Sequence, residues 1–263
     1  MSNDKQMTFL SHLEELRWRL VKAVISILIF AIIIWIYQEW IMENLFLSMN
    51  KKTFITFQLM CDYTKICITE IPVKMQSMSM GGQFSYSMMM SFMGGLVLSF
   101  PYIFYQFWGF VRPGLKLNEI NATKGIVFFV SLLFFSGIIF GYFIVAPLSV
   151  QFFGSYQISK EIENNFTISS YMGTVFSTIF YSGLLFLLPM VSYLLTRIGL
   201  ITPVFLRKYR KHSIVVVLIL AAIITPPDVV SQIIVSIPIV ILYEVGIMVS
   251  ARAAKKIERE SMT

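Results

Sequence analysis

Charged residues are scarce in this sequence. Only 13% of its 263 positions are Asp, Glu, Lys or Arg, whereas 57% are hydrophobic. A soluble domain carries about 25% charged residues. This shortage, together with several long apolar runs, excludes an ordinary soluble domain and predicts an integral membrane protein.

Histidine and cysteine are also rare, with two of each. His12 and His212 are far apart in the sequence, and no histidine lies near Cys61 or Cys67. Since zinc sites need such ligands in clusters, we expect no metal. The sequence also lacks a nucleophile–base set and a glycine-rich phosphate loop, so we expect no enzyme activity and no cofactor. Cys61 and Cys67 are either a disulfide in an oxidising compartment or two free thiols, and the sequence leaves both open.

Acidic residues are outnumbered by basic ones, 14 to 21, which gives a net charge of +7. In a membrane protein this excess indicates basic cytoplasmic loops rather than nucleic-acid binding. Of the 21 basic residues, 16 fall before the first apolar run, after the second, after the fourth and in the C-terminal tail. The bias predicts that both termini are cytoplasmic.

Six apolar segments predict an all-α polytopic membrane protein with six transmembrane helices, built as a single membrane domain over residues 1–263. The predicted helices are 20–37, 84–108, 125–146, 171–196, 213–225 and 233–249. The last two are short: at 1.5 Å per residue, the fifth extends only about 20 Å. The prolines in "TPPD" (225–228) separate the fifth from the sixth, which Pro238 and Glu244 interrupt. In the second segment, Gly94 and Gly95 favour close approach of a neighbouring helix.

The stretch "SHLEELRWRL" (11–20) places charge directly before the first apolar run. Ser11 followed by Glu14 forms a capping box, which predicts the start of a helix at Ser11. Helical spacing then pairs Glu14 with Arg17 and Glu15 with Arg19. Two interpretations stay open. The helix is either interfacial, with charges paired among themselves and with lipid head groups, or its carboxylates accept arginines from a partner.

Four motifs in order give the chain a family resemblance. They are "SHLEELRWRL" (11–20), "FPYIFYQFWGFVRPGL" (100–115), "GYFIVAPL" (141–148) and "TPPDVVSQ" (225–232). On these motifs and the six-segment topology the chain resembles the TatC family. That family provides the receptor subunit of the twin-arginine translocase, which moves folded proteins across the bacterial inner membrane with the proton-motive force.

The resemblance implies a set of site residues for twin-arginine signal peptides. Glu15 and Glu119 match the two family glutamates that receive the peptide, and Arg17 matches an arginine that supports them. The remaining matches lie just before the loop glutamate: Phe110, Gln106 and Pro113. The implied partners are single-span TatA-type subunits, other copies of the chain and the lipid membrane, with the need for a TatB-type subunit left open. No nucleic acid is expected.

Three positions carry a translocation or structural hypothesis. Asp228 matches the family's outer-side aspartate. Glu244 is either a functional intramembrane carboxylate, often an acid in the family, or an interfacial residue paired with Arg252 or tail lysines. Leu187 stands where many family members have a glutamate, and Ser182 or Thr178 is expected to supply polarity instead.

Overall fold

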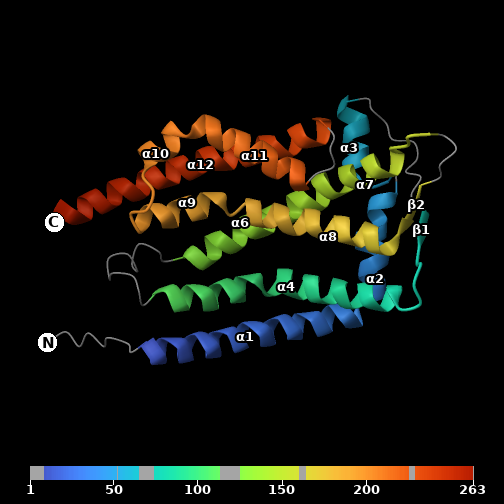
Figure 1. Ribbon diagram of the computed structural model, residues 1–263, viewed down its shortest axis with the longest axis horizontal. Coiled ribbons are helices and arrows are strands. Elements are labelled where there is room, and N and C mark those ends of the chain that lie inside the picture. Colours follow the sequence, from blue (N-terminus) through green and yellow to red (C-terminus); the bar gives the residue numbers. More distant parts are fainter. Residues whose placement is uncertain are drawn as a thin grey trace. The chain divides into compact units, whose positions relative to one another are not determined.

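The computed structural model describes residues 9–51, 53–64, 74–112, 125–159, 164–224 and 229–262. These residues are almost all helical, as expected. Figure 1 shows the elements, which are α1 (Phe9–Ile36), α2 (Gln38–Ile41), the π-helix η1 (Met42–Phe46), the 3₁₀-helix η2 (Leu47–Asn50), α3 (Ile55–Thr64), β1 (Lys74–Gln76), α4 (Gly82–Val111), α6 (Ile126–Phe140), the π-helix η4 (Gly141–Val145), α7 (Ala146–Ser155), β2 (Asn165–Thr167), α8 (Ile168–Leu185), α9 (Leu188–Arg197), α10 (Pro203–Lys208), α11 (Arg210–Ile224) and α12 (Val229–Met262).

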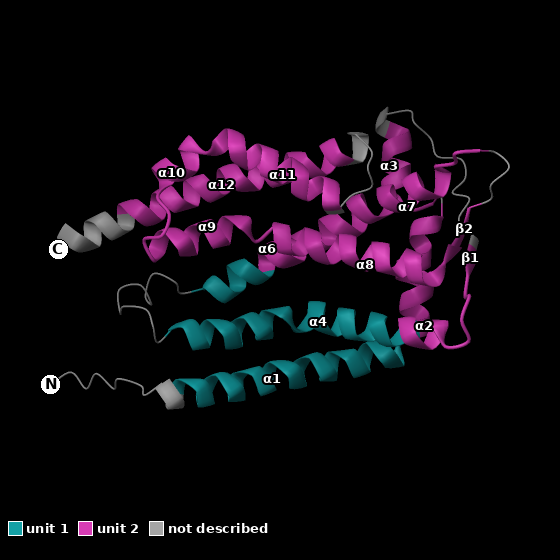
Figure 2. Cartoon of the chain, in the orientation of Figure 1, with its two compact units in different colours: residues 1–38, 87–131 teal, residues 39–86, 132–263 magenta. Residues whose placement is uncertain are grey.

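The chain forms two compact units, coloured separately in Figure 2. Unit 1 contains residues 1–38 and 87–131, so it holds α1, most of α4 and the start of α6. Unit 2 contains residues 39–86 and 132–263, which include α7 to α12. Each unit is described here by itself.

Unit 1 is a pair of long helices, α1 and α4, that approach closely at glycine. A Cβ added to Gly95 would lie 2.8 Å from both the Ala31 amide nitrogen and the Ile27 carbonyl oxygen. Such backbone contact is typical of helix pairs in membranes, where small residues let main chains meet. The close approach predicted for Gly94 and Gly95 is therefore confirmed.

Unit 2 has its core where η4, α11 and α12 meet. The buried cluster consists of Val145, Val217, Ala221, Val235 and Ile239. Further along α12, the hydroxyl of Ser250 lies 2.6 Å from that of Thr196 on α9, and both are buried. Together these contacts fix α12 against both α9 and α11.

The segment between α1 and α4, which the sequence left without a role, is built into unit 2. Tyr171 on α8 donates a buried hydrogen bond of 2.6 Å to the Phe46 carbonyl, and Tyr142 donates one of 3.0 Å to the Leu45 carbonyl. β1 pairs in parallel with β2, with Lys74 opposite Asn165. These contacts tie η1 to α8 and η4, and β1 to β2, within unit 2.

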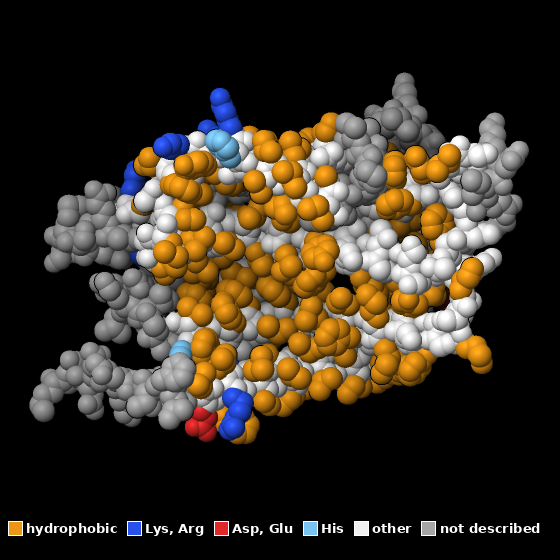
Figure 3. Space-filling model, viewed as in Figure 1, with side chains coloured by type: hydrophobic (Ala, Val, Ile, Leu, Met, Phe, Trp, Pro, Cys, Tyr) orange, Lys and Arg blue, Asp and Glu red, His pale blue; other side chains and the backbone are white. Residues whose placement is uncertain are grey.

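Five helical stretches in the described part of the chain are long and apolar enough to cross a bilayer: 12–36, 82–111, 126–155, 168–197 and 232–255. They agree with five of the predicted segments. The remaining segment, 213–225, corresponds to α11, whose 15 residues extend about 22 Å at 1.5 Å per residue. A full crossing of the bilayer needs about 30 Å, and α11 is shorter than that. The total of six transmembrane helices therefore stays a prediction. Figure 3 shows hydrophobic side chains spread over the visible face of each unit.

Four predicted boundaries differ from the structure. The first helix already includes Phe9, so Ser11 lies inside α1 and is not its N-cap. The third segment continues through the π-turn η4 to Ser155. The fourth segment breaks into α8 and α9 at Phe186 and Leu187, just before Pro189, because proline has no amide hydrogen for the preceding turn. The sixth continues through Pro238 as one 34-residue helix.

Candidate functional site

The best-defined charged site lies at the beginning of α1. Glu15 and Arg19 are one helical turn apart, and Oε1 of Glu15 accepts hydrogen bonds from Nε (2.8 Å) and Nη2 (2.6 Å) of Arg19. Both side chains are about a quarter exposed, at 24% and 26%. The pairing predicted from the i,i+4 spacing is thus confirmed, and the partial burial makes it stronger than an ordinary surface pair.

The second carboxylate oxygen of Glu15 has a different environment. Oε2 is buried, and it has no hydrogen-bond partner among the described residues. A buried acceptor without a donor costs about 1–3 kcal/mol, and more when the group is charged. This oxygen is therefore a buried acceptor without a donor among the described residues.

The guanidinium of Arg19 lies against α4 at Gly109. A Cβ added to Gly109 would lie 2.8 Å from Cζ of Arg19, so the guanidinium occupies the space that a larger residue would fill. Helical spacing pairs Arg19 with Glu15 but assigns Arg19 no role, and the sequence motifs give Gly109 no role either. A glycine inside an apolar helix costs about 1 kcal/mol relative to alanine, so its presence indicates a packing reason. This is the signal in the sequence by which Gly109 could have been identified.

Phe110 lies at the same end of unit 1 as Glu15. Its ring stacks on the imidazole of His12, with centroids 4.2 Å apart and an interplanar angle of 14°. Gln106 is one turn earlier on α4 and is 6% exposed. Of the predicted site residues, the structure therefore brings Glu15, Phe110 and Gln106 to one end of the α1–α4 pair.

Arg17 is not part of this arrangement. Its guanidinium lies 3.8 Å from Glu14, with both side chains about two-thirds exposed, and its Cζ lies 5.7 Å from the centre of the Trp18 ring. This is the predicted i,i+3 pair, and its exposure makes it weak. Three other predicted site residues, Pro113, Glu119 and Asp228, lie outside the residues that the structure describes.

Glu244 is paired in unit 2, but with Arg210 at the start of α11 instead of Arg252 or the tail lysines. Nε of Arg210 lies 2.7 Å from Oε1, and its Nη2 donates to Oε2 over 2.8 Å. Each carboxylate oxygen thus has its own donor, which is the bidentate geometry of a strong arginine–carboxylate pair. Both residues are partly exposed, at 49% and 39%.

The polar residues proposed to replace the family's intramembrane acid are packed inside unit 2. Thr178 and Ser182 are 1% and 2% exposed, and Ser182 Oγ has no hydrogen-bond partner within the described ranges. A Cβ on Gly141 would lie 3.1 Å from this hydroxyl. Ser182 therefore faces a helix–helix contact, and Leu187 lies in the turn between α8 and α9.

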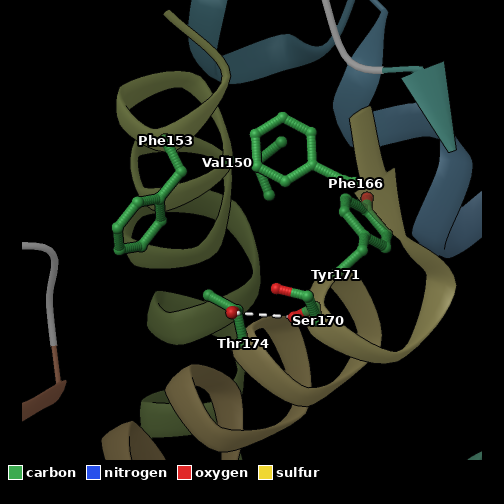
Figure 4. A pocket seen from close by; sticks show the side chains of 6 residues that line it. All are labelled: Val150, Phe153, Phe166, Ser170, Tyr171 and Thr174. Atoms are coloured by element: carbon green, nitrogen blue, oxygen red, sulfur yellow. Dashed lines mark hydrogen bonds between the residues drawn. The ribbon is translucent and has the colours of Figure 1, made fainter. Parts of the chain in front are cut away.

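A small pocket in unit 2 is lined mainly by apolar side chains from α7, β2 and α8. Its volume is about 120 Å³, and its lining consists of Val150, Phe153, Phe166, Ser170, Tyr171 and Thr174 (Figure 4). The hydroxyl of Thr174 donates to the Ser170 carbonyl over 2.9 Å. The pocket is small and has no charged lining residue, so it offers nothing comparable to the free oxygen of Glu15.

The two cysteines and any grouped metal ligands are the remaining candidates for a site. Cys61, on α3, is disulfide-bonded, which decides between the two states left open by the sequence. Cys67 lies outside the described residues. Among the residues described, no three His, Cys, Asp or Glu side chains are grouped to hold a metal ion.

Comparisons with known proteins agree with one another. Residues 11–238 match the model of a family described as "Sec-independent protein translocase protein (TatC)". A TatC from Blattabacterium sp. subsp. Periplaneta americana is 38% identical, covering 97% of this chain and all of that protein. The TatCy protein of Bacillus subtilis is 32% identical, covering 97% and 93%. A crystal structure described as the twin arginine translocase receptor TatC is 30% identical, covers 92% of this chain and 99% of its own, and superposes with a TM-score of 0.66.

Proposed function

This chain belongs to the TatC family of Sec-independent protein translocase proteins, and from that premise we propose that it is the receptor for twin-arginine signal peptides. Membership makes it a multi-pass membrane protein and a transport subunit rather than an enzyme. The proposal adds the ligand, its binding residues, the topology and the partners.

The observation that carries the proposal is the unpaired, buried Oε2 of Glu15. A guanidinium is planar and always charged, and it donates several N–H groups in a fixed geometry. It is also less strongly hydrated than a lysine ammonium, so it enters a partly dehydrated site at lower cost. A buried carboxylate oxygen that lacks a donor therefore favours arginine over lysine in the bound peptide.

Two adjacent arginines need more than one carboxylate, and we assign the second to Glu119. On α4, Phe110 stacks on His12 of α1 and follows Gly109, which contacts Arg19. Gln106 lies one turn earlier on α4, and Pro113 follows in the sequence. We propose that Phe110 and Gln106 form the surface on which the peptide rests, and that Pro113, which matches the family proline before the loop glutamate, belongs to the same site. Exposed Arg17 supports the site only through the surrounding charge.

The proposed topology has six spans in a single membrane domain, with α11 as the short one and both termini in the cytoplasm of a bacterial inner membrane. The distribution of charge within each unit supports this. In unit 1, Arg19 lies at the α4 end that precedes Arg112. In unit 2, Arg197, Arg210 and Arg252 occupy the end where α9, α11 and α12 meet. Figure 3 shows Lys and Arg side chains of unit 2 gathered near α10.

The proposed partners are TatA-type single-span subunits, with or without a TatB-type subunit, and further copies of the chain. Transport would use the proton-motive force, so an uncoupler should stop it. We assign Glu244 a structural role, since Arg210 already satisfies both of its oxygens. Asp228 keeps the outer-side role that the family resemblance implies.

Crosslinking in membranes tests the proposal. A photoreactive group placed beside the Arg-Arg pair of a signal peptide should crosslink to the wild-type chain and not to the Glu15→Ala, Glu119→Ala double variant. Glu14→Ala is the matched control, because Glu14 is the neighbouring acid and is 66% exposed. Normal crosslinking of the double variant would overturn the proposal. Export of an Arg-Arg reporter in a strain lacking its own TatC provides the functional readout.

A further inference from the structure

We infer that Arg19 and Gly109 are positioning residues that hold Glu15 with Oε2 free for an incoming guanidinium. The inference rests on the proposed function and adds two specificity-determining residues to it. Glu15, Arg19 and Gly109 all belong to unit 1, on α1 and α4, which run side by side in Figure 2.

Arg19 uses its donors differently from Arg210. In a bidentate pair each N–H finds its own oxygen, as Arg210 does on Glu244. Arg19 instead directs both Nε and Nη2 to Oε1 of Glu15. This contact fixes the rotation of the carboxylate and leaves Oε2 without a donor in the described structure. Arg19 therefore orients the acceptor without occupying it.

Gly109 leaves the space that keeps Arg19 in place. Its guanidinium lies where a Cβ on residue 109 would be, 2.8 Å from Cζ. An alanine at this position would meet the flexible end of a long side chain, so the guanidinium would move while α4 kept its course. Alanine also favours helix more than glycine does. Gly109→Ala should therefore misplace Arg19 without unfolding the helix pair.

The consequence is selectivity. A fixed, partly dehydrated acceptor rewards a planar donor that arrives from one direction, whereas a freely rotating carboxylate accepts an ammonium equally well. Losing Arg19 or displacing it should thus weaken Arg-Arg binding and leave Lys-Lys binding nearly unchanged. If Arg19 instead competed with the peptide for Glu15, removing it would strengthen binding, which is the opposite result.

Equilibrium binding to the purified full-length chain tests the inference, with synthetic signal peptides carrying Arg-Arg or Lys-Lys as probes. We expect Arg19→Gln and Gly109→Ala each to weaken Arg-Arg binding about tenfold, the loss typical of one charged hydrogen bond. Lys-Lys binding should stay within about twofold, since that peptide does not use the oriented oxygen. The controls are Lys22→Gln, which removes a nearby exposed charge, and Gly173→Ala, where an added Cβ meets nothing within 4 Å.

The double variant Arg19→Gln, Gly109→Ala makes the test sharper. Because glutamine removes the group that alanine would displace, the two effects should not add, and the double variant should bind like Arg19→Gln alone. Additive losses, unchanged Arg-Arg binding in either single variant, or tighter binding by Arg19→Gln would each overturn the inference.

Failure of the inference and failure of the proposed function are distinguishable. A wild-type chain that binds Arg-Arg and Lys-Lys peptides equally would remove the proposed function itself. A wild-type preference that Glu15→Gln abolishes, but that both Arg19→Gln and Gly109→Ala retain, would leave the function intact and remove only the positioning role.

Discussion

Two arginine–glutamate pairs in this protein differ in how many carboxylate oxygens the arginine contacts. In unit 2, Arg210 and Glu244 come from different helices and share two contacts of 2.7 and 2.8 Å, one on each carboxylate oxygen. In unit 1, Arg19 and Glu15 come from one helix, and both arginine donors reach the same oxygen. The first pair is complete, whereas the second leaves a buried acceptor free.

The difference shows why proximity to an arginine does not settle what a membrane glutamate does. A saturated carboxylate joins α11 to α12 and has little left to offer a ligand. A partly buried carboxylate with one unpaired oxygen gains free energy when one more donor binds to it. Glu15 and Glu244 are both acids in or beside apolar segments of the sequence, yet we assign only Glu15 to peptide binding.

The largest effect that this comparison predicts is on Glu15. Glu15→Gln keeps the shape of the side chain but removes its charge, and losing one partner of a buried charged contact costs about 2 kcal/mol or more, which is about 30-fold. Export of an Arg-Arg reporter, measured in cells that lack their own TatC, should fall by that factor. Glu14→Gln should export normally, and equal rates for the two variants would contradict the comparison.

The next effect concerns one close helix approach at a glycine in each unit. Gly95→Ala would place a Cβ 2.8 Å from backbone atoms of α1, whereas Gly246→Ala meets the Ser192 hydroxyl at 3.1 Å. Overpacking against backbone costs about 1–3 kcal/mol, so Gly95→Ala should lower the thermal unfolding midpoint and the affinity for an Arg-Arg peptide.

Gly246→Ala should change the unfolding midpoint less and leave peptide affinity unaltered, because the Ser192 hydroxyl can rotate away. If Gly246→Ala reduced peptide affinity as much as Gly95→Ala, binding would not depend on unit 1 in particular.

A smaller effect is expected at Glu244. Since Arg210 and Glu244 are 49% and 39% exposed, solvent screens the pair, and Glu244→Gln should lower the free energy of unfolding by about 1 kcal/mol or less. Peptide affinity and reporter export should match the wild type. A loss of export with unchanged stability would instead show that Glu244 acts in transport and would break the comparison.

The smallest effect is expected at Ser182 on α8, which also carries a buried side-chain oxygen without a partner among the described residues. Its hydroxyl is 2% exposed and has no donor or acceptor among the described residues. Ser182→Ala removes an unsatisfied buried group, so the free energy of unfolding should stay constant or rise by about 1 kcal/mol, with export unchanged. A clear loss of export would restore the idea that Ser182 replaces the family's intramembrane acid.

Local spacing predicted one pair correctly and could not predict the other. Glu15 and Arg19 are one turn apart on a helix, so sequence alone places them together. Arg210 and Glu244 are 34 residues apart, and only the packing of α11 on α12 joins them. Arg252, which with the tail lysines was the partner in one of the two interpretations of Glu244, is eight residues away, about 12 Å along a helix and too far for an ion pair.

The same distinction, between local sequence patterns and contacts distant in sequence, explains which helix boundaries were predictable. Long apolar segments were predictable because the bilayer demands them, and five of them are present. The capping box at Ser11 was misleading, since the helix starts earlier. The short helices α2 and α3 and the π-turns have too few residues to show a periodic pattern, and they depend on side chains far away in sequence, such as Tyr171.

The most direct test of the central claim is the ratio of dissociation constants for Lys-Lys and Arg-Arg signal peptides, measured on the full-length protein with and without Glu15→Gln. We predict that the wild-type chain prefers Arg-Arg by about tenfold or more and that Glu15→Gln brings the ratio close to one. A wild-type ratio near one, or a preference that survives Glu15→Gln, would contradict the assignment of Glu15 as the arginine acceptor.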